Sequence, residues 1–193
     1  MLYSELQCSE AIRKAVERMG FAEMTEIQEK TIPVMLAGHD VIAKAPTGTG
    51  KTCAFGIPVA EHIQPENKYP QAVIMAPTRE LAQQIAEELS NLTYFMPEVQ
   101  VACVYGGANM EKQAKRLAEG CQIVVATPGR LMDHYKHHSI DISHVTQIVL
   151  DEADEMLNMG FYKDVKQIID TMKNDCVAVF ILFARFKSTE YPA

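Results

Sequence analysis

The sequence predicts an α/β domain of three layers, in which helices cover both faces of a mostly parallel sheet. Six short runs of residues are apolar almost throughout, which is typical of strands buried on both faces. Between them lie segments whose apolar residues recur with the spacing of one helical face. Because strands alternate with helices, we expect parallel pairing through right-handed crossovers.

The elements can be justified in order along the chain. The first helix is predicted over 9–21, where Ser9 suits an N-cap, Ile12 and Val16 share a face, and Gly20 suits a stop. The same kind of apolar stripe predicts further helices over 25–38, 51–63, 79–92, 109–120, 129–138 and 160–174. Apolar, largely β-branched runs predict strands over 40–45, 71–76, 99–106, 122–128, 145–154 and 176–184.

Length and composition indicate one globular domain. The chain has 193 residues, of which 48% are hydrophobic, and no apolar run approaches the roughly 20 residues of a membrane span. Its five scattered cysteines lack CxxC spacing, so we interpret them as reduced thiols of a cytoplasmic protein. The net charge of −7 argues against a broad basic platform, so any contact with nucleic acid needs individually placed groups.

The stretch Ala-Pro-Thr-Gly-Thr-Gly-Lys-Thr at 45–52 fits most of the phosphate-loop pattern, with alanine where a first glycine usually stands. It lies between a predicted strand and a predicted helix, where backbone N–H groups and the helix dipole can meet phosphates. Lys51 would contact the β- and γ-phosphates, and Thr52 would ligate Mg²⁺. The alternative is a glycine-rich turn that binds nothing. The predicted nucleotide-binding residues are Pro46, Thr47, Gly48, Thr49, Gly50, Lys51 and Thr52.

The stretch Asp-Glu-Ala-Asp at 151–154 closes another predicted strand. Ligands of a parallel sheet bind at the carboxyl ends of its strands, so this cluster and the phosphate loop should share one rim. Asp151 would hold Mg²⁺ and Glu152 would polarise the attacking water, while Asp154 counts among the nucleotide-binding residues. Such a cluster alone is usually a solvated loop. Together with the phosphate loop it indicates nucleotide hydrolysis, with Lys51, Asp151 and Glu152 as catalytic residues.

With these motifs in place, residues 3–183 resemble the first RecA-like domain of DEAD-box RNA helicases. Residues 20–28, Gly-Phe-Ala-Glu-Met-Thr-Glu-Ile-Gln, are similar to the Q motif of that family, and the resemblance implies that Gln28 reads the edge of adenine. It implies contacts near the base for Phe21 and for Tyr3, an aromatic residue seventeen positions before the motif. The implied cofactors are ATP and Mg²⁺, and the implied partner is RNA.

Three further stretches resemble the family's contacts with the RNA backbone. Each follows a predicted strand at a helix start, where N–H groups and threonine hydroxyls can meet phosphates. Contacts of this kind would let an acidic domain bind RNA by its shape and sugars rather than by its base sequence. The two arginines could equally brace loops. The candidates are Pro77, Thr78, Arg79, Gly106, Gly107, Thr127, Pro128, Gly129 and Arg130.

Three histidines, at 134, 137 and 138, could suggest a metal site. No matching set of further ligands accompanies them, so we interpret them as the polar end of a helix.

The sequence departs from the family in two places. Met24 stands where the family commonly has proline, which leaves Gln28 in register. The family also ends its next strand with Ser-Ala-Thr, whereas this chain has Ala-Arg-Phe at 184–186, so 184–193 is predicted to be a non-native or divergent tail.

A second RecA-like domain normally supplies arginine fingers worth about 10³ to 10⁵ in rate. We therefore expect the chain alone to be a monomer that binds nucleotide weakly and unwinds little RNA.

Three functions remain in competition at this point. The first is the ATP-binding half of an RNA helicase. The second is another P-loop nucleic-acid ATPase, such as a DNA translocase. The third is a non-enzymatic helicase module that docks a partner protein. The Q-like segment and the spelling Asp-Glu-Ala-Asp favour the first. The lack of a second domain in this sequence keeps the third open.

Overall fold

A computed structural model describes residues 1–46, 48–172 and 176–183 of the chain. Two of the expectations above, the phosphate contact of Thr47 and the divergence of the tail 184–193, lie outside the described residues.

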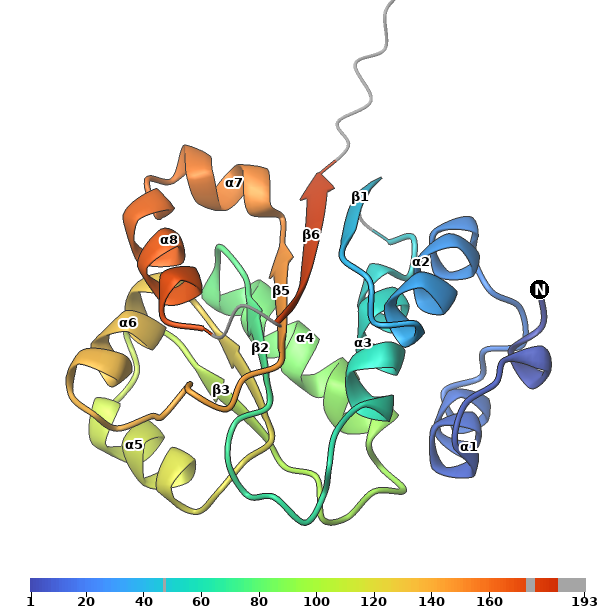
Figure 1. Ribbon diagram of the computed structural model, residues 1–193, viewed down its shortest axis with the longest axis horizontal. Helices are drawn as coiled ribbons and strands as arrows, with labels where there is room; N and C mark the ends of the chain where they lie inside the picture. The colour runs from blue at the N-terminus through green and yellow to red at the C-terminus, as the bar shows by residue number, and fades with distance from the viewer. Residues whose placement is uncertain (47, 173–175, 184–193) are drawn as a thin grey trace, which may run out of the picture.

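The centre of the molecule is a six-stranded sheet with the order β1-β6-β5-β2-β4-β3, and every pairing between these strands is parallel. Figure 1 shows the sheet with β6 between β1 and β5. The prediction of a mostly parallel sheet is confirmed. Its strands are β1 (Val41–Ala45), β2 (Ala72–Met75), β3 (Val101–Val104), β4 (Ile123–Ala126), β5 (Gln147–Asp151) and β6 (Val177–Phe183).

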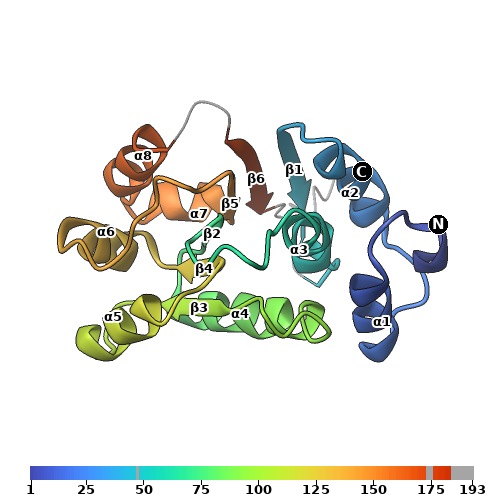
Figure 2. The same cartoon turned by 60° about the horizontal axis from the view of Figure 1, so that its bottom comes forward.

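Helices cover both faces of the sheet, and each face has its own hydrophobic core (Figure 2). Along β2, Ile74 packs into the core of the first four α-helices, whereas Val73 and Met75 pack into the core of the other four. The helices of the first layer are α1 (Glu10–Arg18), α2 (Glu26–Leu36), α3 (Lys51–Glu61) and α4 (Arg79–Leu92). Those of the second are α5 (Met110–Ala118), α6 (Pro128–Lys136), α7 (Ala153–Asn158) and α8 (Tyr162–Asp170).

Local signals account for several helix ends. Ser9 caps α1 by accepting a hydrogen bond from the N–H of Ile12, and Thr78 caps α4 by accepting one from Leu81. Gly20 and Gly38 follow α1 and α2 with positive φ, a conformation that glycine adopts without strain. A short 3₁₀ helix, η1 (Tyr3–Glu5), precedes α1 and was not expected from the sequence.

The first strand is less buried than its apolar appearance suggested. It lies at an edge of the sheet, and the side chain of Ile42 is 76% exposed. Alternate residues of β1 point to solvent, as the exposed Lys44 shows. The expectation of a strand buried on both faces is therefore wrong for residues 40–45, because Val41 and Ala43 pack against the first core, whereas no described residue of β1 belongs to the core of the other face.

The segment after β5 also differs from expectation. The strand ends at Asp151 rather than continuing to Asp154, because Glu152 adopts a left-handed conformation with φ of 54° and α7 begins at the next residue. Helix α7 has only six residues, too few for a periodic pattern to reveal it.

Among the described residues, no helix is both long and apolar enough to cross a membrane. All five cysteines are free thiols, as the sequence indicated.

Candidate functional site

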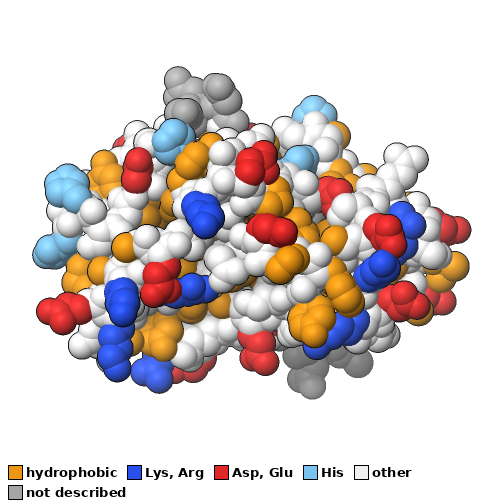
Figure 3. All heavy atoms as spheres, turned by 90° about the horizontal axis from the view of Figure 1, so that it is seen from below, with side chains coloured by type: hydrophobic (Ala, Val, Ile, Leu, Met, Phe, Trp, Pro, Cys, Tyr) orange, Lys and Arg blue, Asp and Glu red, His pale blue; other side chains and the backbone are white. Residues whose placement is uncertain are grey.

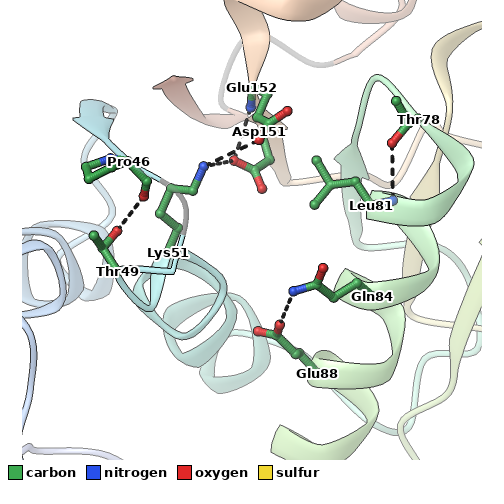
Figure 4. Close-up of polar contacts among 9 residues, drawn as sticks. All are labelled: Pro46, Thr49, Lys51, Thr78, Leu81, Gln84, Glu88, Asp151 and Glu152. Carbon is green, nitrogen blue, oxygen red and sulfur yellow. Dashed lines mark hydrogen bonds and ion pairs between the residues drawn. The ribbon is translucent and has the colours of Figure 1, made fainter. Parts of the chain in front are cut away.

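The phosphate-loop segment lies where β1 ends and α3 begins, at the carboxyl rim of the sheet. Gly48 and Gly50 both have φ of 77°, and Gly50 is the N-cap of α3. The Thr49 hydroxyl donates to the carbonyl of Pro46 at 2.8 Å, which closes the turn (Figure 4). Two left-handed glycines and a helix N-terminus are the geometry that directs backbone N–H groups at an anion.

The phosphate-loop lysine lies against the acidic strand end, as Figure 4 shows. The Nζ of Lys51 is 3.5 Å from Oδ1 of Asp151 and 3.9 Å from Oε1 of Glu152. Lys51 and Asp151 are buried, with 7% and 2% of their side chains exposed. The predicted meeting of 45–52 and 151–154 on one rim is therefore confirmed by the geometry.

Burial shapes the ionisation of both carboxyls. It raises the pKa of Asp151 above its ordinary value, while the ammonium of Lys51 and the N–H of Glu152 act in the opposite direction. The pKa of Glu152 is raised for the same reason, and the neighbouring Asp151 adds to the effect. Two carboxyls held beside one buried cation form a site that favours a further positive charge.

The remaining predicted nucleotide ligands lie close by in the chain. Thr52 is in the first turn of α3 and is nearly buried, and Asp154 is in the first turn of α7. The described residues contain no group of three or more His, Cys, Asp or Glu side chains arranged to hold a metal on their own. A hydroxyl of Thr52 and a carboxylate of Asp151 are nevertheless the oxygen donors that Mg²⁺ prefers when phosphates complete its coordination.

The Q-like segment packs directly on the phosphate loop. Gln28 is buried, accepts a hydrogen bond from the N–H of Thr25 at 2.8 Å, and donates from Nε2 to the carbonyl of Gly50 at 3.0 Å. The hydroxyl of Thr25 donates to the carbonyl of Thr49 at 2.8 Å. The predicted contact of Gln28 with adenine stays a prediction, but both polar groups of its amide already have partners within the chain.

The two aromatic candidates occupy different environments. Tyr3 is buried, and its ring lies 6.4 Å from that of Phe21, centroid to centroid, while Phe21 is 44% exposed. Burial raises the pKa of the Tyr3 hydroxyl. Phe21 is therefore the accessible ring of the two, whereas Tyr3 packs in the core, and their contacts with a base stay a prediction.

The candidate RNA-contact segments also lie at the carboxyl ends of strands. Thr78 and Arg79 are exposed after β2, and Gly106 and Gly107 are exposed after β3, with φ of 82° at Gly107. Thr127 is the N-cap of α6 and has no side-chain capping bond, so its hydroxyl is not committed to the helix. Pro77, Pro128 and Gly129 complete these turns, and the two prolines are buried.

The two arginines of these segments both contact the protein. The guanidinium of Arg79 lies 5.2 Å from the centroid of the Tyr105 ring. Arg130 donates from Nη1 to the carbonyl of Ala108 at 3.0 Å and to Oε1 of Gln113 at 3.2 Å, and its side chain is 12% exposed. Of the two alternatives for Arg130, contact with RNA or bracing of a loop, the geometry favours bracing.

Comparison with known proteins decides the family. A family profile described as DEAD/DEAH box helicase matches residues 25–184. The chain belongs to this family. The identification agrees with the resemblance seen in the sequence and covers both the phosphate loop and the acidic strand end.

Relatives of this DEAD-box chain include proteins named ATP-dependent RNA helicases. CshA of Limosilactobacillus reuteri is 51% identical over 175 residues, which cover 91% of this chain and 35% of that protein. DeaD of Escherichia coli is 44% identical over 167 residues, which cover 86% of this chain and 27% of that protein. The chain thus spans about a third of the length of the curated relatives it matches.

The fold of the DEAD-box chain also matches solved structures. The crystal structure of a DEAD box protein from Methanococcus jannaschii superposes with a TM-score of 0.87 at 39% identity, covering 94% of this chain and 50% of that one. A structure described as a hypothetical ATP-dependent RNA helicase from Sulfolobus tokodaii gives a TM-score of 0.83. The three-layer fold class is therefore confirmed.

Sequence reasoning missed the burial or the contacts of three polar residues near this DEAD-box site. Gln113 is buried beneath the Gly106-Gly107 turn, and His134 is fully buried, so the interpretation of His134 as part of a polar helix end is wrong. Glu88 of α4 contacts Gln84 at 3.0 Å and raises the pKa of Asp151 slightly by its charge. The helical spacing of Gln113 with the apolar Leu117 was the one available signal that Gln113 faces inward.

Proposed function

We propose that this chain is the ATP-binding part of an ATP-dependent RNA helicase, which hydrolyses ATP with Mg²⁺ to remodel or unwind RNA. The observation that supports this most directly is the separation of 3.5 Å between Nζ of Lys51 and Oδ1 of Asp151. It brings the phosphate-loop cation and the acidic strand end into one site, the arrangement that nucleotide hydrolysis requires. The names of the DEAD-box relatives, such as CshA of Limosilactobacillus reuteri, agree with it.

In this proposal each residue has a distinct task. The N–H groups of the loop between Gly48 and Lys51 hold the phosphates, and Lys51 turns from the carboxyls toward the β- and γ-phosphates. Thr52 and Asp151 would hold Mg²⁺, which when bound neutralises charge that develops on the phosphates. Glu152 orients the attacking water. Because Lys51 balances the charge of only one of the two carboxylates, Asp151 and Glu152, its departure makes the site still more favourable for the metal.

RNA would bind along the turns that follow β2, β3 and β4. The exposed hydroxyl of Thr78, the N–H groups of Gly106 and Gly107, and the start of α6 offer hydrogen bonds to a sugar-phosphate backbone. The net charge of −7 suits recognition by placed donors better than by bulk charge. Figure 3 shows the opposite side of the molecule, at the amino ends of the strands, where basic and acidic side chains are also interspersed. Such binding discriminates little between base sequences.

The complete activity needs more than this chain. A second RecA-like domain, in the part of the protein that the longer relatives carry, would close over ATP and RNA and add arginine fingers. We propose that the chain alone binds nucleotide, turns it over poorly and unwinds little duplex.

Calorimetric titration of the chain with ATP and Mg²⁺ tests the nucleotide site. Wild type should bind ATP or ADP more tightly than GTP, Lys51→Ala should lose phosphate-dependent binding, and Gln28→Ala should weaken the adenine preference. Lys30→Ala, an exposed change on the same helix as Gln28, is the matched control.

Repeating the titration with single-stranded RNA and single-stranded DNA separates the alternatives. A preference for RNA supports the helicase proposal. Equal binding of both nucleic acids would favour a different P-loop ATPase, such as a DNA translocase. No heat of nucleotide binding at all would overturn the proposal and favour a partner-docking module.

A further inference from the structure

A buried glutamine connects two of the candidate RNA-contact segments. Gln113 of α5 is 9% exposed and donates from Nε2 to the carbonyl of Tyr105 at 3.1 Å. Its Oε1 accepts from Nη1 of Arg130 at 3.2 Å and lies 3.3 Å from Nε2 of His134. One side chain of α5 thus contacts the turn after β3 and two residues of α6.

Arg130 completes the connection. The same Nη1 that reaches Gln113 also donates to the carbonyl of Ala108 at 3.0 Å. The glycine pair at 106–107 therefore lies between two carbonyls, those of Tyr105 and Ala108, that are held by side chains of α5 and α6. Glycine places few restraints on its own backbone, so the shape of this exposed turn depends on these two anchors.

The orientation of the Gln113 amide is determined by its partners. Nε2 must face the Tyr105 carbonyl, since a carbonyl can only accept, and Oε1 must face the guanidinium of Arg130, which can only donate. For Oε1 to accept from His134 as well, Nε2 of the imidazole must carry a hydrogen. Burial, and secondly the charge of Arg130, lower the pKa of His134, which agrees with a neutral ring.

Other side chains would not reproduce this set of contacts. Glutamate would keep the acceptor for Arg130 but could not donate to the Tyr105 carbonyl, and leucine would make neither bond. Tyr105 extends the arrangement to α4, because its hydroxyl accepts from Nε2 of Gln83 at 2.9 Å and its ring lies beside the guanidinium of Arg79.

From these contacts we infer that Gln113 is a positioning residue for RNA binding. It holds the Gly106-Gly107 turn in a set relation to the N-terminus of α6, so that N–H groups of both segments face the phosphates of one strand. Gln113 does not itself touch RNA in this arrangement. The inference rests on the proposed function, in which these segments bind the RNA backbone.

The test compares Gln113 with a second buried glutamine, Gln122. Gln113 lies near the carboxyl ends of the strands, and Gln122 lies at their amino ends. Gln122 is 1% exposed, accepts from the N–H of Gln100 at 2.9 Å, and donates to the carbonyl of Pro65 at 3.0 Å. Gln122→Leu therefore removes a similar set of buried hydrogen bonds far from the carboxyl rim. Gln113→Leu, Gln113→Glu and Gln122→Leu would be prepared in the 193-residue chain.

The first readout is the backbone geometry, measured by ¹H–¹⁵N NMR without any ligand. Gln113→Leu should displace the amide signals of Gly106 and Gly107 and change the ¹⁵N shifts of the His134 ring, while Gly48 and Gly50 stay in place. Gln122→Leu should leave all of these unchanged. Unmoved signals of Gly106 and Gly107 in Gln113→Leu would overturn the inference, whatever the chain does with RNA.

The second readout is the affinity for a fluorescent single-stranded RNA of ten nucleotides, measured by anisotropy with ATP and Mg²⁺. Gln113→Leu should bind about tenfold more weakly, which corresponds to loss of about one buried hydrogen bond, while the affinity for ATP should change less than about twofold. Gln113→Glu, which folds with an acceptor for Arg130, should fall between wild type and Gln113→Leu. An equal loss in Gln122→Leu would contradict positioning and indicate general destabilisation.

Failure of the two ideas gives different results. If wild type binds no RNA, the proposed function fails, and the NMR comparison still decides whether Gln113 holds the turn. If wild type binds RNA and Gln113→Leu binds it equally well, the proposed function stands and the positioning role of Gln113 fails.

Discussion

The side-chain amide of Gln28 donates to the backbone carbonyl of Gly50 at 3.0 Å, so α2 is attached to the residue that begins α3. The N–H of Thr25 is held by the other end of the same amide at 2.8 Å. A residue expected to read a base is thus also part of the support of the phosphate loop. The predicted adenine contact and the support of the loop therefore fall on the same side chain.

Gln28→Ala should lower the free energy of unfolding, because it removes the side-chain partner of the Thr25 N–H and one of the two hydrogen bonds that the Gly50 carbonyl accepts. We expect a loss of roughly 1–3 kcal/mol in urea denaturation without nucleotide. Lys30→Ala, exposed on the same helix, should change it by less than about 0.5 kcal/mol. Equal effects of the two substitutions would show that the contact contributes nothing to the empty protein.

The two left-handed glycines of the phosphate loop should respond differently to alanine. Both have φ of 77°, so both substitutions strain the backbone by about 1 kcal/mol or more. A Cβ at Gly48 meets nothing within 4 Å, whereas a Cβ at Gly50 would clash with the side-chain amide of Gln28. Gly50→Ala should therefore be the more destabilising change in chemical denaturation. It should also weaken ATP binding more than Gly48→Ala does. If Gly48→Ala proves as costly, the packing of Gln28 on the loop is not as described.

His134 predicts a pH dependence of stability. Its pKa in the folded protein is lowered below the ordinary 6.5, by burial first, so the unfolded chain binds more protons as the pH falls below that value. The contribution of His134 to the free energy of unfolding should be fully present above pH 6.5. It should decline as the pH falls toward the lowered pKa. His134→Gln removes this contribution, so wild type should lose stability relative to the variant as the pH falls below about 6.5.

Denaturant melts of both proteins at several pH values measure this difference. Ile12→Val, a buried apolar change in the other layer, should cost the same at each pH and serves as the control. A pH-independent difference between wild type and His134→Gln would mean that the ring already titrates normally in the folded state.

The thiols should be slow to react in the native protein. Burial raises the pKa of Cys53 to about 12 and those of Cys103, Cys121 and Cys176 to about 11, which leaves little thiolate near neutral pH. An aromatic disulfide reagent should titrate all five cysteines in guanidinium and few of them, slowly, in the folded protein. Cys53 and Cys121, the two buried thiols, should react last, as mass spectrometry of labelled peptides can measure. Rapid labelling of Cys53 would contradict its place in the core.

Periodicity and turn residues were sufficient to predict the parallel sheet and helices such as α4, whose bounds of 79–92 were predicted from its apolar stripe alone. The meeting of Lys51 with Asp151 could also be predicted, because the carboxyl ends of parallel strands share a rim. The exposure of Ile42 could not, since apolar composition does not reveal which face of a strand the helices leave uncovered.

The polar contacts were harder to predict than the elements. The buried state of His134 depends on Gln113, twenty-one residues away along the chain, and no local pattern joins them. The bracing role of Arg130 has the same origin, since its partner carbonyl belongs to Ala108 on another turn. Pairings between distant segments arise from packing, which a single sequence expresses only weakly.

The division of the hydrophobic residues into two separate cores bears on how this domain tolerates change. Helices α2 and α3, which contact the phosphate loop, belong to one core, and α5 and α6, which contact the Gly106-Gly107 turn, belong to the other. A cavity in one layer reaches the other only through the sheet. In the proposed function, substitutions in α5 and α6 would therefore alter the candidate RNA turns after β3 and β4 with little effect on the phosphate loop.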